Sequence, residues 1–333
     1  MTLRLAILGY GNVARALVRL LLLKDATLRA EYGFDWRITG AISRRLGAAL
    51  DPAGLDPQAL AAATALGAPM DSRDFIARCD ADVLIELSVL VPQTGQPATD
   101  HVRAALGRGL HVVTANKGPI AFAYRELRDL AAAQGRRLLF ESTVMDGAPI
   151  FSMARTGLRG ATFEGFRGIL NSTTNLVLGL VESGRSFDGA VAEAQRIGVA
   201  EADPSNDLDG WDATVKTVVL ANVLAGADAR PPEVDRTGIR GLSVDDIRAA
   251  AAAGEHYKLV CSGRREGDAL RLRVAPERLP AADPLSAVSG TSSSVTFYTD
   301  VLPPLTLVEG HAGSALTTLQ TTAFGVLADL LAI

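Results

Sequence analysis

Apolar residues recur along the first half of the chain in two alternating patterns. Residues 3–8 form a short, mostly apolar run, and the stretch that follows repeats apolar side chains at Val13, Leu17 and Leu20. The run predicts a buried strand, whereas a spacing of three and four residues predicts a helix with one apolar face. A turn that contains two glycines, residues 9–14, separates the two elements.

This alternation continues beyond the first pair. Strands are predicted at residues 36–43, 81–90, 109–118 and 136–144, with helical segments closed by glycine or asparagine between them. Strands that alternate with helices favour a parallel sheet covered on both faces. Residues 44–71, rich in Ala, Gly and Pro, are interpreted as a loop with short helices.

The pattern changes near residue 145. Helical stretches and strand-like segments are mixed beyond this point, at residues 163–171, 187–197, 212–224, 243–254, 268–279 and 322–332. The mixture predicts an α+β second domain, and a chain of 333 residues is long enough for two domains.

Composition narrows the class of protein. With 48% hydrophobic and 21% charged residues and a net charge of -4, the chain has no basic surface for nucleic acid. Its longest apolar runs are too short to span a membrane, and its N-terminus lacks the pattern of a signal peptide. Two cysteines, Cys79 and Cys261, are too few for a disulfide framework or a cysteine-based zinc site. We expect a cytoplasmic enzyme with inert, buried thiols.

The glycine turn fits the dinucleotide fingerprint. Gly9 permits the tight turn, Gly11 lets the backbone approach a pyrophosphate, and the small Ala14 lets helix and strand pack closely. The phosphates would lie at the N-terminus of the following helix. Because a strand precedes the motif and a helix follows it, we expect a Rossmann-type parallel sheet that binds a nicotinamide dinucleotide.

The end of the second predicted strand bears on the choice of dinucleotide. An acidic side chain there would accept a hydrogen bond from the ribose of NAD. Arg44 and Arg45 occupy this position instead, and guanidinium groups suit the 2′-phosphate of NADP. The sequence therefore favours NADP over NAD.

Five carboxylates crowd into residues 201–216, a stretch that ends with a lysine. Asp209 is predicted to cap the following helix with Asp212 as its capping-box partner, and Asp212 and Lys216 are four residues apart on one helix face. One interpretation is a surface ion pair worth a few tenths of a kcal/mol. The other is a desolvated lysine that acts as acid or base toward an alcohol or carbonyl. Spacing alone favours the first.

Four motifs, taken in order, favour the second interpretation. They are "TANK" at residues 114–117, "ESTVMDGAP" at 141–149, "GILNSTTN" at 168–175 and the acidic stretch. Together they resemble homoserine dehydrogenase, over a range from Gly9 to the C-terminus. The resemblance implies NAD(P)-dependent interconversion of L-homoserine and L-aspartate 4-semialdehyde, in the branch that leads to threonine, methionine and isoleucine.

The resemblance also implies roles for individual residues. Lys216 would be the general acid or base, Asp212 would orient it, and Lys117 would assist proton transfer. Glu201 would hold the substrate ammonium with Asp207 close by. Further substrate contacts would come from Asn171 and Thr173, and cofactor contacts from Gly9, Gly11, Asn12, Val13, Arg44, Arg45, Ser88, Lys117 and Gly310. A monovalent cation such as sodium would bind mostly to backbone oxygens of Glu141, Val144, Asp146 and Ala148.

The domain expectations follow from the same resemblance. A dinucleotide-binding domain is expected at residues 1–145, a substrate-binding and dimerisation domain at 146–305, and a segment that returns to the first domain at 306–333. We expect a homodimer formed through the sheet of the second domain. The chain ends after its final helix, so we expect neither a regulatory ACT domain nor threonine inhibition through one.

Two departures from the family pattern stand out. Ser172 replaces a glycine that is common in the "NSTTN" motif, and a serine there would have to adopt a different φ angle. The loop after Glu309 is longer than usual and carries His311, which could alter the affinity for the cofactor.

Two other functions stay open at this point. One is a dehydrogenase for a related hydroxy amino acid or amino aldehyde, and the other is a non-catalytic sensor that binds NADP. Aspartate-semialdehyde dehydrogenase is disfavoured because it needs a nucleophilic cysteine in a suitable motif.

Overall fold

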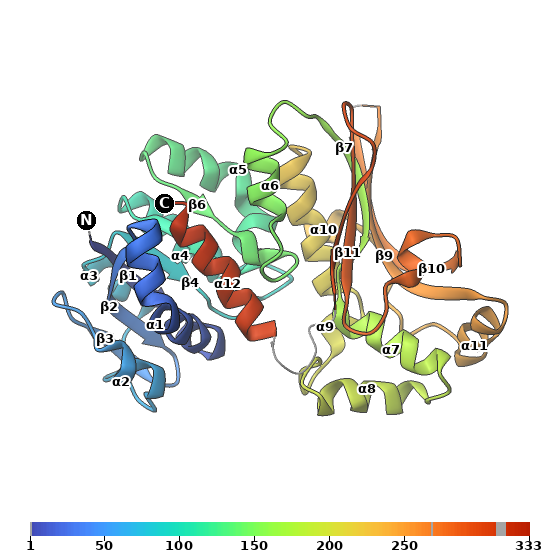
Figure 1. Cartoon of the computed structure of the whole chain (residues 1–333), viewed down its shortest axis with the longest axis horizontal. Helices are drawn as coiled ribbons and strands as arrows, with labels where there is room; N and C mark the ends of the chain where they lie inside the picture. Colours follow the sequence, from blue (N-terminus) through green and yellow to red (C-terminus); the bar gives the residue numbers. More distant parts are fainter. Residues whose placement is uncertain (1, 268, 311–317) are drawn as a thin grey trace. The chain divides into compact units, whose positions relative to one another are not determined.

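The computed structural model describes residues 2–267, 269–310 and 318–333, which belong to two compact units (Figure 1). Unit 1 contains residues 1–157 together with 314–333, and unit 2 contains residues 158–313. None of the helices within these described ranges is long and apolar enough to cross a lipid bilayer.

Unit 1 is built on a six-stranded sheet with the order β3-β2-β1-β4-β5-β6. All neighbours are parallel except β3, which pairs antiparallel with β2 at the edge. The strands are β1 (Thr2–Leu8), β2 (Asp35–Ser43), β3 (Gly47–Leu50), β4 (Val83–Glu86), β5 (His111–Thr114) and β6 (Leu138–Leu139). The predicted parallel sheet is confirmed. Strand β3 lies in a segment interpreted as a loop with short helices, so that interpretation was incomplete.

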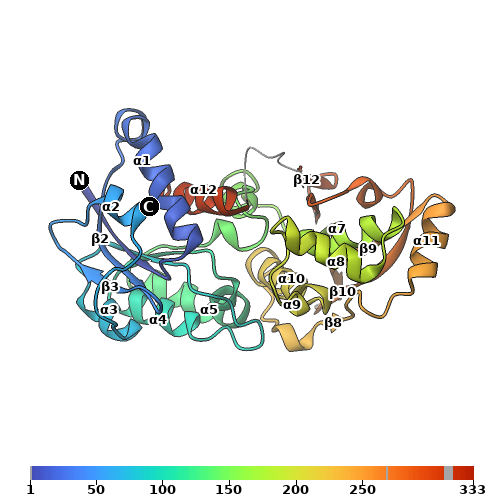
Figure 2. The ribbon, with the colours of Figure 1, turned by 90° about the horizontal axis from the view of Figure 1, so that it is seen from below.

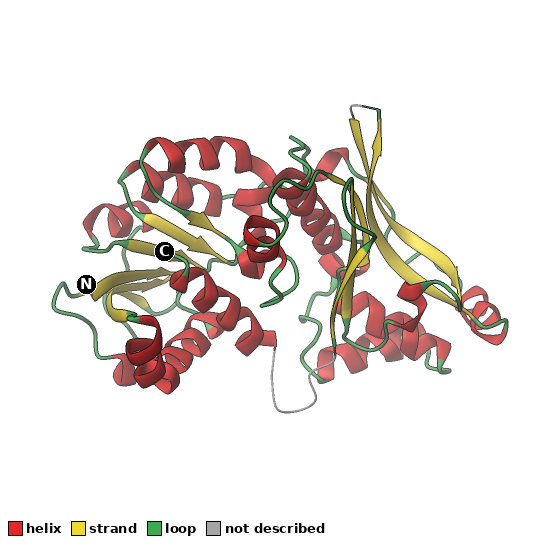
Figure 3. Ribbon diagram, turned by 45° about the horizontal axis from the view of Figure 1, so that its top comes forward, coloured by secondary structure: helices red, strands yellow, loops and turns green. Residues whose placement is uncertain are grey.

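Helices cover both faces of this sheet, as Figure 3 shows. Leu5 and Ile7 of β1 point to one face, and Ala6 and Leu8 point to the other, so the strand is apolar without interruption. On the first face lie α1 (Asn12–Tyr32), α2 (Pro57–Ala62) and α12 (Thr318–Leu331), and on the second α3 (Ser72–Arg78), α4 (Ala98–Gly107) and α5 (Lys117–Ala133). Helix α12 packs beside α1 (Figure 1), which brings the C-terminus back to unit 1.

Residues 136–144 do not form the single strand that was predicted. Strand β6 has only two residues, and a 3₁₀ turn (Glu141–Thr143) follows it. The backbone turns because both the N–H and the hydroxyl of Thr143 donate to the carbonyl of Phe140. After the turn comes the short helix α6 (Ile150–Thr156).

Unit 2 has a second six-stranded sheet, with the order β12-β11-β7-β9-β10-β8. Its strands are β7 (Phe163–Ile169), β8 (Asp235–Arg236), β9 (Glu255–Glu266), β10 (Ala269–Pro280), β11 (Ser293–Thr299) and β12 (Leu305–Glu309). All pairs are antiparallel except the short β8–β10 pair. The sheet and its helices confirm an α+β second domain, although β9, β11 and β12 were not predicted.

Helices α7 (Ser172–Glu182), α10 (Trp211–Leu224) and α11 (Val244–Ala252) pack against β9. Helix α8 (Phe187–Arg196) runs beside α7, as Figure 2 shows, and the one-turn helix α9 (Ser205–Leu208) precedes α10. Ser172 is the first residue of α7 and has no positive φ, so its substitution for glycine introduces no backbone strain.

Sheet order in unit 1 reverses between β1 and β4, because β2 lies on one side of β1 and β4 on the other. Ligands of open α/β sheets bind at the carboxyl ends of strands at such a point. Gly9 ends β1 here with a φ of +94°, and a Cβ at this position would lie 2.5 Å from the backbone nitrogen of Ser88. The turn after β1 is therefore packed directly on the turn after β4.

Replacing Gly9 by Ala should destabilise the fold by about 3 kcal/mol or more, because backbone strain is added to a clash with backbone atoms. The matched control is Gly33→Ala, where φ is +61° but no atom lies within 4 Å of the new Cβ. That change should cost only ~1 kcal/mol. Urea unfolding of both variants measures the difference, and equal losses would contradict the close packing at Gly9.

Candidate active site

The glycine turn of unit 1 leaves the N-terminus of α1 exposed. Gly11 donates its N–H to the carbonyl of Gly9 at 2.7 Å, and the N–H groups of Gly9 and Tyr10 donate to the carbonyl of Ile42 at 3.0 and 2.8 Å. These bonds tie the turn between β1 and α1 to the end of β2. Gly11 is the N-cap of α1 and is exposed, as is Asn12. The N-terminus of α1 thus exposes backbone N–H groups of the kind that bind phosphate.

The other predicted cofactor-binding residues of unit 1 come directly after the carboxyl ends of strands. Arg44 and Arg45 are exposed in the turn between β2 and β3. Ser88 follows β4, and Lys117 is the first residue of α5 after β5. Carboxyl ends of parallel strands meet at one edge, so these residues share the edge with the glycine turn. In the linking loop, Gly310 is described and exposed, whereas His311 lies outside the described residues.

Two carboxylates meet at one amide in unit 2. Asn171 Nδ2 donates to Asp207 Oδ1 at 2.7 Å and to Asp212 Oδ2 at 3.0 Å. The other end of the same amide caps α7, because Asn171 Oδ1 accepts hydrogen bonds from the N–H and the hydroxyl of Thr174, both at 2.9 Å. The asparagine therefore joins the start of α7 to the acidic stretch.

Lys216 completes this cluster. Its Nζ lies 3.0 Å from Asp212 Oδ2 and donates to the carbonyl of Leu170 at 2.6 Å. Only 16% of the Lys216 side chain and 18% of the Asp212 side chain are exposed. The predicted pair is present, but it is partly buried and connected to β7 and α7, so it differs from a surface ion pair.

Burial and mutual repulsion dominate the electrostatics of the cluster. The pKa of Asp207 is raised, first by burial and second by the charge of Asp212, while hydrogen bonds from Asn171 and Thr173 and the charge of Lys216 lower it. Such a site gains free energy when a cation enters it, because the cation offsets the repulsion between two carboxylates.

Two other carboxylates of the stretch are engaged by nearby residues of unit 2. Asp203 accepts hydrogen bonds from the N–H and hydroxyl of Ser205, and Asp209 is paired with Arg240 at 2.6 Å. The prediction that Asp209 caps the following helix is wrong. Gly210 is the N-cap of α10, with a φ of +80°, because the chain reverses sharply between α9 and α10.

Two predicted substrate residues belong to the segments around this cluster. Thr173, on α7, contributes a hydrogen bond that lowers the pKa of Asp207, and its hydroxyl lies 3.3 Å from the carbonyl oxygen of Val199. Glu201 is exposed, and its backbone carbonyl accepts a hydrogen bond from Gln195 Nε2 at 3.2 Å. Trp211 stacks against Arg236, whose guanidinium carbon is 4.0 Å from the ring centroid. This contact covers the start of α10.

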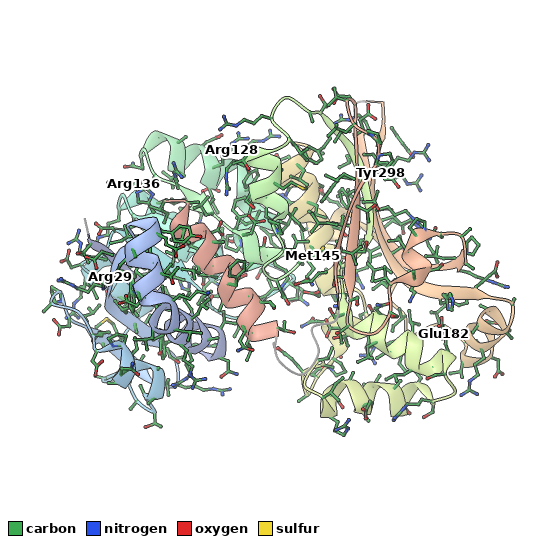
Figure 4. All side chains as sticks on the ribbon, viewed as in Figure 1. Arg29, Arg128, Arg136, Met145, Glu182 and Tyr298 are labelled. Atoms are coloured by element: carbon green, nitrogen blue, oxygen red, sulfur yellow. The ribbon has the colours of Figure 1, made fainter. Side chains whose placement is uncertain are left out.

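The loop proposed to bind a cation is tied down by its side chains. Both carboxylate oxygens of Glu141 accept backbone N–H groups at the start of α6, from Phe151 at 2.6 Å and Ser152 at 2.7 Å. Asp146 has a φ of +43° and accepts the hydroxyls of Thr321 and Thr322. The loop, in which Figure 4 labels Met145, is therefore held by α6 and α12.

Asp329 of α12 is a buried carboxylate that sequence reasoning missed. Its Oδ2 accepts the backbone N–H of Glu141 at 2.7 Å. Burial is the main cause that raises its pKa to about 7, and the charge of Glu141 adds to the effect. An acidic residue in an otherwise apolar helix, "TAFGVLADLLA", was the available signal.

Neither cysteine is placed for catalysis. Cys79 and Cys261 are fully buried, as predicted. Burial raises the pKa of the Cys261 thiol to about 11 and also raises the pKa of Cys79. Thiols of this kind are poor nucleophiles at neutral pH, which agrees with a mechanism that does not use them.

A glycine turn of this kind can hold a dinucleotide, and a partly buried lysine beside an aspartate can transfer a proton to or from an alcohol or carbonyl. The chain thus has the parts of a nicotinamide-dependent oxidoreductase. A family model described as homoserine dehydrogenase matches residues 149–331, and one described as homoserine dehydrogenase, NAD binding domain, matches residues 9–141. The chain belongs to the homoserine dehydrogenase family, and the predicted activity with NAD(P) is confirmed.

Individual relatives match over nearly their full length. The NAD(+)-dependent homoserine dehydrogenase of Pseudomonas canavaninivorans is 37% identical, over 99% of this chain and 96% of its own. A crystal structure of a putative homoserine dehydrogenase from Archaeoglobus fulgidus has a TM-score of 0.87 at 30% identity, over 99% and 98% of the two chains. A hyperthermophilic archaeal homoserine dehydrogenase in complex with NADPH has a TM-score of 0.81 at 27% identity, over 99% and 97%.

The raised pKa of Asp329 predicts a pH-dependent stability. The folded state holds a proton on Asp329 that the unfolded state has lost, so native stability should fall as pH rises from about 4 to about 7. Asp329→Asn cannot titrate and should be more stable than the native chain at pH ~8, by on the order of 3 kcal/mol, with little difference at pH ~4.

Urea unfolding across this pH range measures the effect. Asp300→Asn is the control, because Asp300 is exposed and the Thr162 N–H lowers its pKa, so its replacement should give no gain at high pH. A difference between the Asp329 variant and the native chain that does not change with pH would contradict the assignment.

Proposed function

We propose that Lys216 is the general acid and base of the reaction and that Asp212 orients it. The observation that carries this proposal is the position of the lysine ammonium between the Asp212 carboxylate and the Leu170 carbonyl. Reduction of the aldehyde needs a hydride at carbon and a proton at oxygen. The nicotinamide, when bound, supplies the hydride, and the Lys216 ammonium donates the proton.

In the opposite direction, neutral Lys216 accepts the proton of the homoserine hydroxyl. Asp212 stabilises the ammonium that forms, and the fixed Leu170 carbonyl limits the directions in which Nζ can point. Lys117 is proposed to assist the proton transfer. Because Lys216 donates only when protonated and accepts only when neutral, the two directions favour different protonation states.

The substrate ammonium is received by Asp207 and Glu201. Support for Asp207 comes from its burial beside Asp212, which a cation relieves. Glu201 is exposed near the start of the acidic stretch and adds a second negative charge. Asn171 and Thr173 hold Asp207 in place, so they contribute to substrate binding through the carboxylate as well as directly.

NADP is proposed as the preferred cofactor. Arg44 and Arg45 are exposed after β2, and no acidic residue occupies the turn between β2 and β3. Two guanidinium groups favour a 2′-phosphate, whereas they offer nothing specific to a ribose hydroxyl.

A monovalent cation, if bound at residues 141–148, would rely on backbone oxygens of the loop, such as those of Val144, Asp146 and Ala148. The Glu141 carboxylate is already engaged by two backbone N–H groups, so it would hold the loop's shape rather than supply the main charge. The ion would then be structural.

A cytoplasmic homodimer is the proposed form of the protein. Unit 2 exposes several large apolar side chains on and between its last two strands, namely Tyr298, Val301, Leu302 and Val308. Figure 4 labels Tyr298, which lies on β11. Exposed apolar groups that gather on one part of a surface are typical of an interface between subunits.

Lys216→Met should reduce kcat for L-homoserine oxidation by about 10²–10⁴-fold, because it removes the proton acceptor. The Kd for NADPH, measured by fluorescence, should change by less than about threefold, since the dinucleotide turn belongs to unit 1. Lys24→Met on the exposed surface of α1 is the control. Loss of both turnover and NADPH binding would mean that Lys216 supports the fold.

Replacing Arg44 and Arg45 together by Ala should raise the KM for NADP by about 10–100-fold, which corresponds to loss of charge-assisted hydrogen bonds. The KM for NAD should stay within about threefold of the native value. Arg78→Ala is the control, because Arg78 is exposed on α3, and its KM values for NADP and NAD should both stay within about threefold of native. Steady-state rates at saturating L-homoserine measure these constants. Equal effects on the two cofactors would rule out a 2′-phosphate contact.

A further inference from the structure

Glu86 is a fully buried carboxylate for which the chemistry above has no use. It is the last residue of β4, with 0% of its surface exposed, and it lies between the ends of β1 and β5. A charge in such a place is costly unless donors surround it. The hydrogen-bond donors around the Glu86 carboxylate indicate its role.

Donors from three elements converge on this carboxylate. Oε1 accepts the N–H of Ser88 at 3.2 Å and also the Ser88 hydroxyl. The hydroxyl of Thr114 lies 3.1 Å from Oε2 and 3.0 Å from the backbone carbonyl oxygen of Glu86, so its hydrogen is shared between the two. His101 of α4 places Nδ1 3.4 Å from Oε1, and its Nε2 lies 2.9 Å from the hydroxyl of Ser72. This arrangement matches the tautomer in which Nδ1 carries the hydrogen toward Glu86 and Nε2 accepts from Ser72.

The network continues to the start of α5. The Thr114 hydroxyl, which donates to Glu86, accepts the N–H of Asn116 at 3.0 Å. Asn116 then caps α5 by accepting the N–H of Gly118 at 2.9 Å, and its amide donates to the Ser88 carbonyl at 2.9 Å. Lys117 lies between Asn116 and Gly118 in the chain, so its backbone is fixed on both sides.

We infer that Glu86 is a positioning residue, which holds Ser88 and Lys117 in place for the nicotinamide and the reacting oxygen by bonding both the turn after β4 and the end of β5. The inference rests on the proposed roles of Lys117 and Ser88. A carboxylate suits this task because it only accepts, and every group around it donates. A glutamine at position 86 would direct its own N–H groups at one of those donors.

The opposite end of the same strand provides a matched comparison. Asp82 immediately precedes β4 and accepts three hydrogen bonds from Arg4, at 2.7, 2.9 and 3.1 Å. It is a well-bonded carboxylate at the amino end of the strand, away from the edge where Ser88 and Lys117 lie. Asp82→Asn and Glu86→Gln should both lower stability, but only Glu86→Gln should affect the reaction.

The experiment measures kcat, the KM for L-homoserine, the Kd for NADPH and the thermal midpoint of the full chain. Glu86→Gln should lower kcat about 10–100-fold, the loss typical of a displaced catalytic group, with the KM for L-homoserine within about threefold. Asp82→Asn should keep the native kcat. A kcat for Glu86→Gln within about twofold of native, at a lowered thermal midpoint, overturns the inference.

A second pair of variants applies if Glu86→Gln does not fold. Thr114→Val removes the hydroxyl that links Glu86 to Asn116 without changing any charge, and Thr114→Ser keeps it. We expect Thr114→Val to lower kcat about 10-fold and Thr114→Ser to restore it. Equal kcat values for the two variants overturn the inference.

The double variant Glu86→Gln/Lys117→Met separates this inference from the proposed function. If Glu86 acts through Lys117, the double variant should have the same kcat as Lys117→Met alone, within about threefold. Losses that multiply overturn the inference and leave the role of Lys117 intact. A native kcat for Lys117→Met instead refutes the proposed role of Lys117, and with it the route through which Glu86 was inferred to act.

Discussion

Two aspartates that share one amide donor form the constraint on which unit 2 depends. Asp207 and Asp212 repel each other across the Nδ2 of Asn171, and burial raises the pKa of Asp207 further. A protein keeps such an arrangement only where cations offset it. Lys216 supplies one positive charge when it is protonated, and the proposed second cation is the substrate ammonium. The site therefore stores repulsion that an amino acid substrate relieves, so binding energy and chemical identity of the substrate are linked.

The surrounding structure maintains this arrangement. Asn171 can direct its Nδ2 at both carboxylates because its Oδ1 caps α7, and Lys216 Nζ is oriented by the carbonyl of Leu170, the residue after β7. Gly210 turns the chain sharply enough that α10 presents Asp212 and Lys216 to the same point. Unit 1 uses a comparable device at the end of β4, where donors gather on a buried carboxylate. In both units, polar groups at the carboxyl end of a strand are fixed by neighbouring backbone rather than left to solvent.

Local patterns in the sequence predict much of this organisation. Periodicity gives the central strands of unit 1 and its long first helix, because these elements bury continuous apolar faces, whereas the edge strand β3 was missed. Helical spacing gives the Asp212–Lys216 pair. Contacts between distant segments are a different matter. Asp209 pairs with Arg240, and Gly210 caps the helix instead. Asp329 accepts the N–H of Glu141. Both contacts join residues that are distant in the sequence, so local spacing cannot predict them. The 3₁₀ turn after β6 was missed for the same reason, since apolar side chains around it are typical of a strand.

In the proposed function, the acidic cluster binds the ammonium of an amino acid and accepts the proton of its hydroxyl, while the bound nicotinamide takes the hydride. The most direct test is the initial rate at which the native chain reduces NADP, and separately NAD, with L-homoserine as the alcohol, followed by the absorbance of the reduced nicotinamide. 4-Hydroxybutanoate, which keeps the hydroxyl and the carboxylate but lacks the ammonium, serves as the comparison. We expect rapid turnover of L-homoserine and at least a 100-fold lower kcat/KM for 4-hydroxybutanoate, because ~3 kcal/mol of charge-assisted binding is lost. Similar kcat/KM values for the two alcohols would contradict the proposed function.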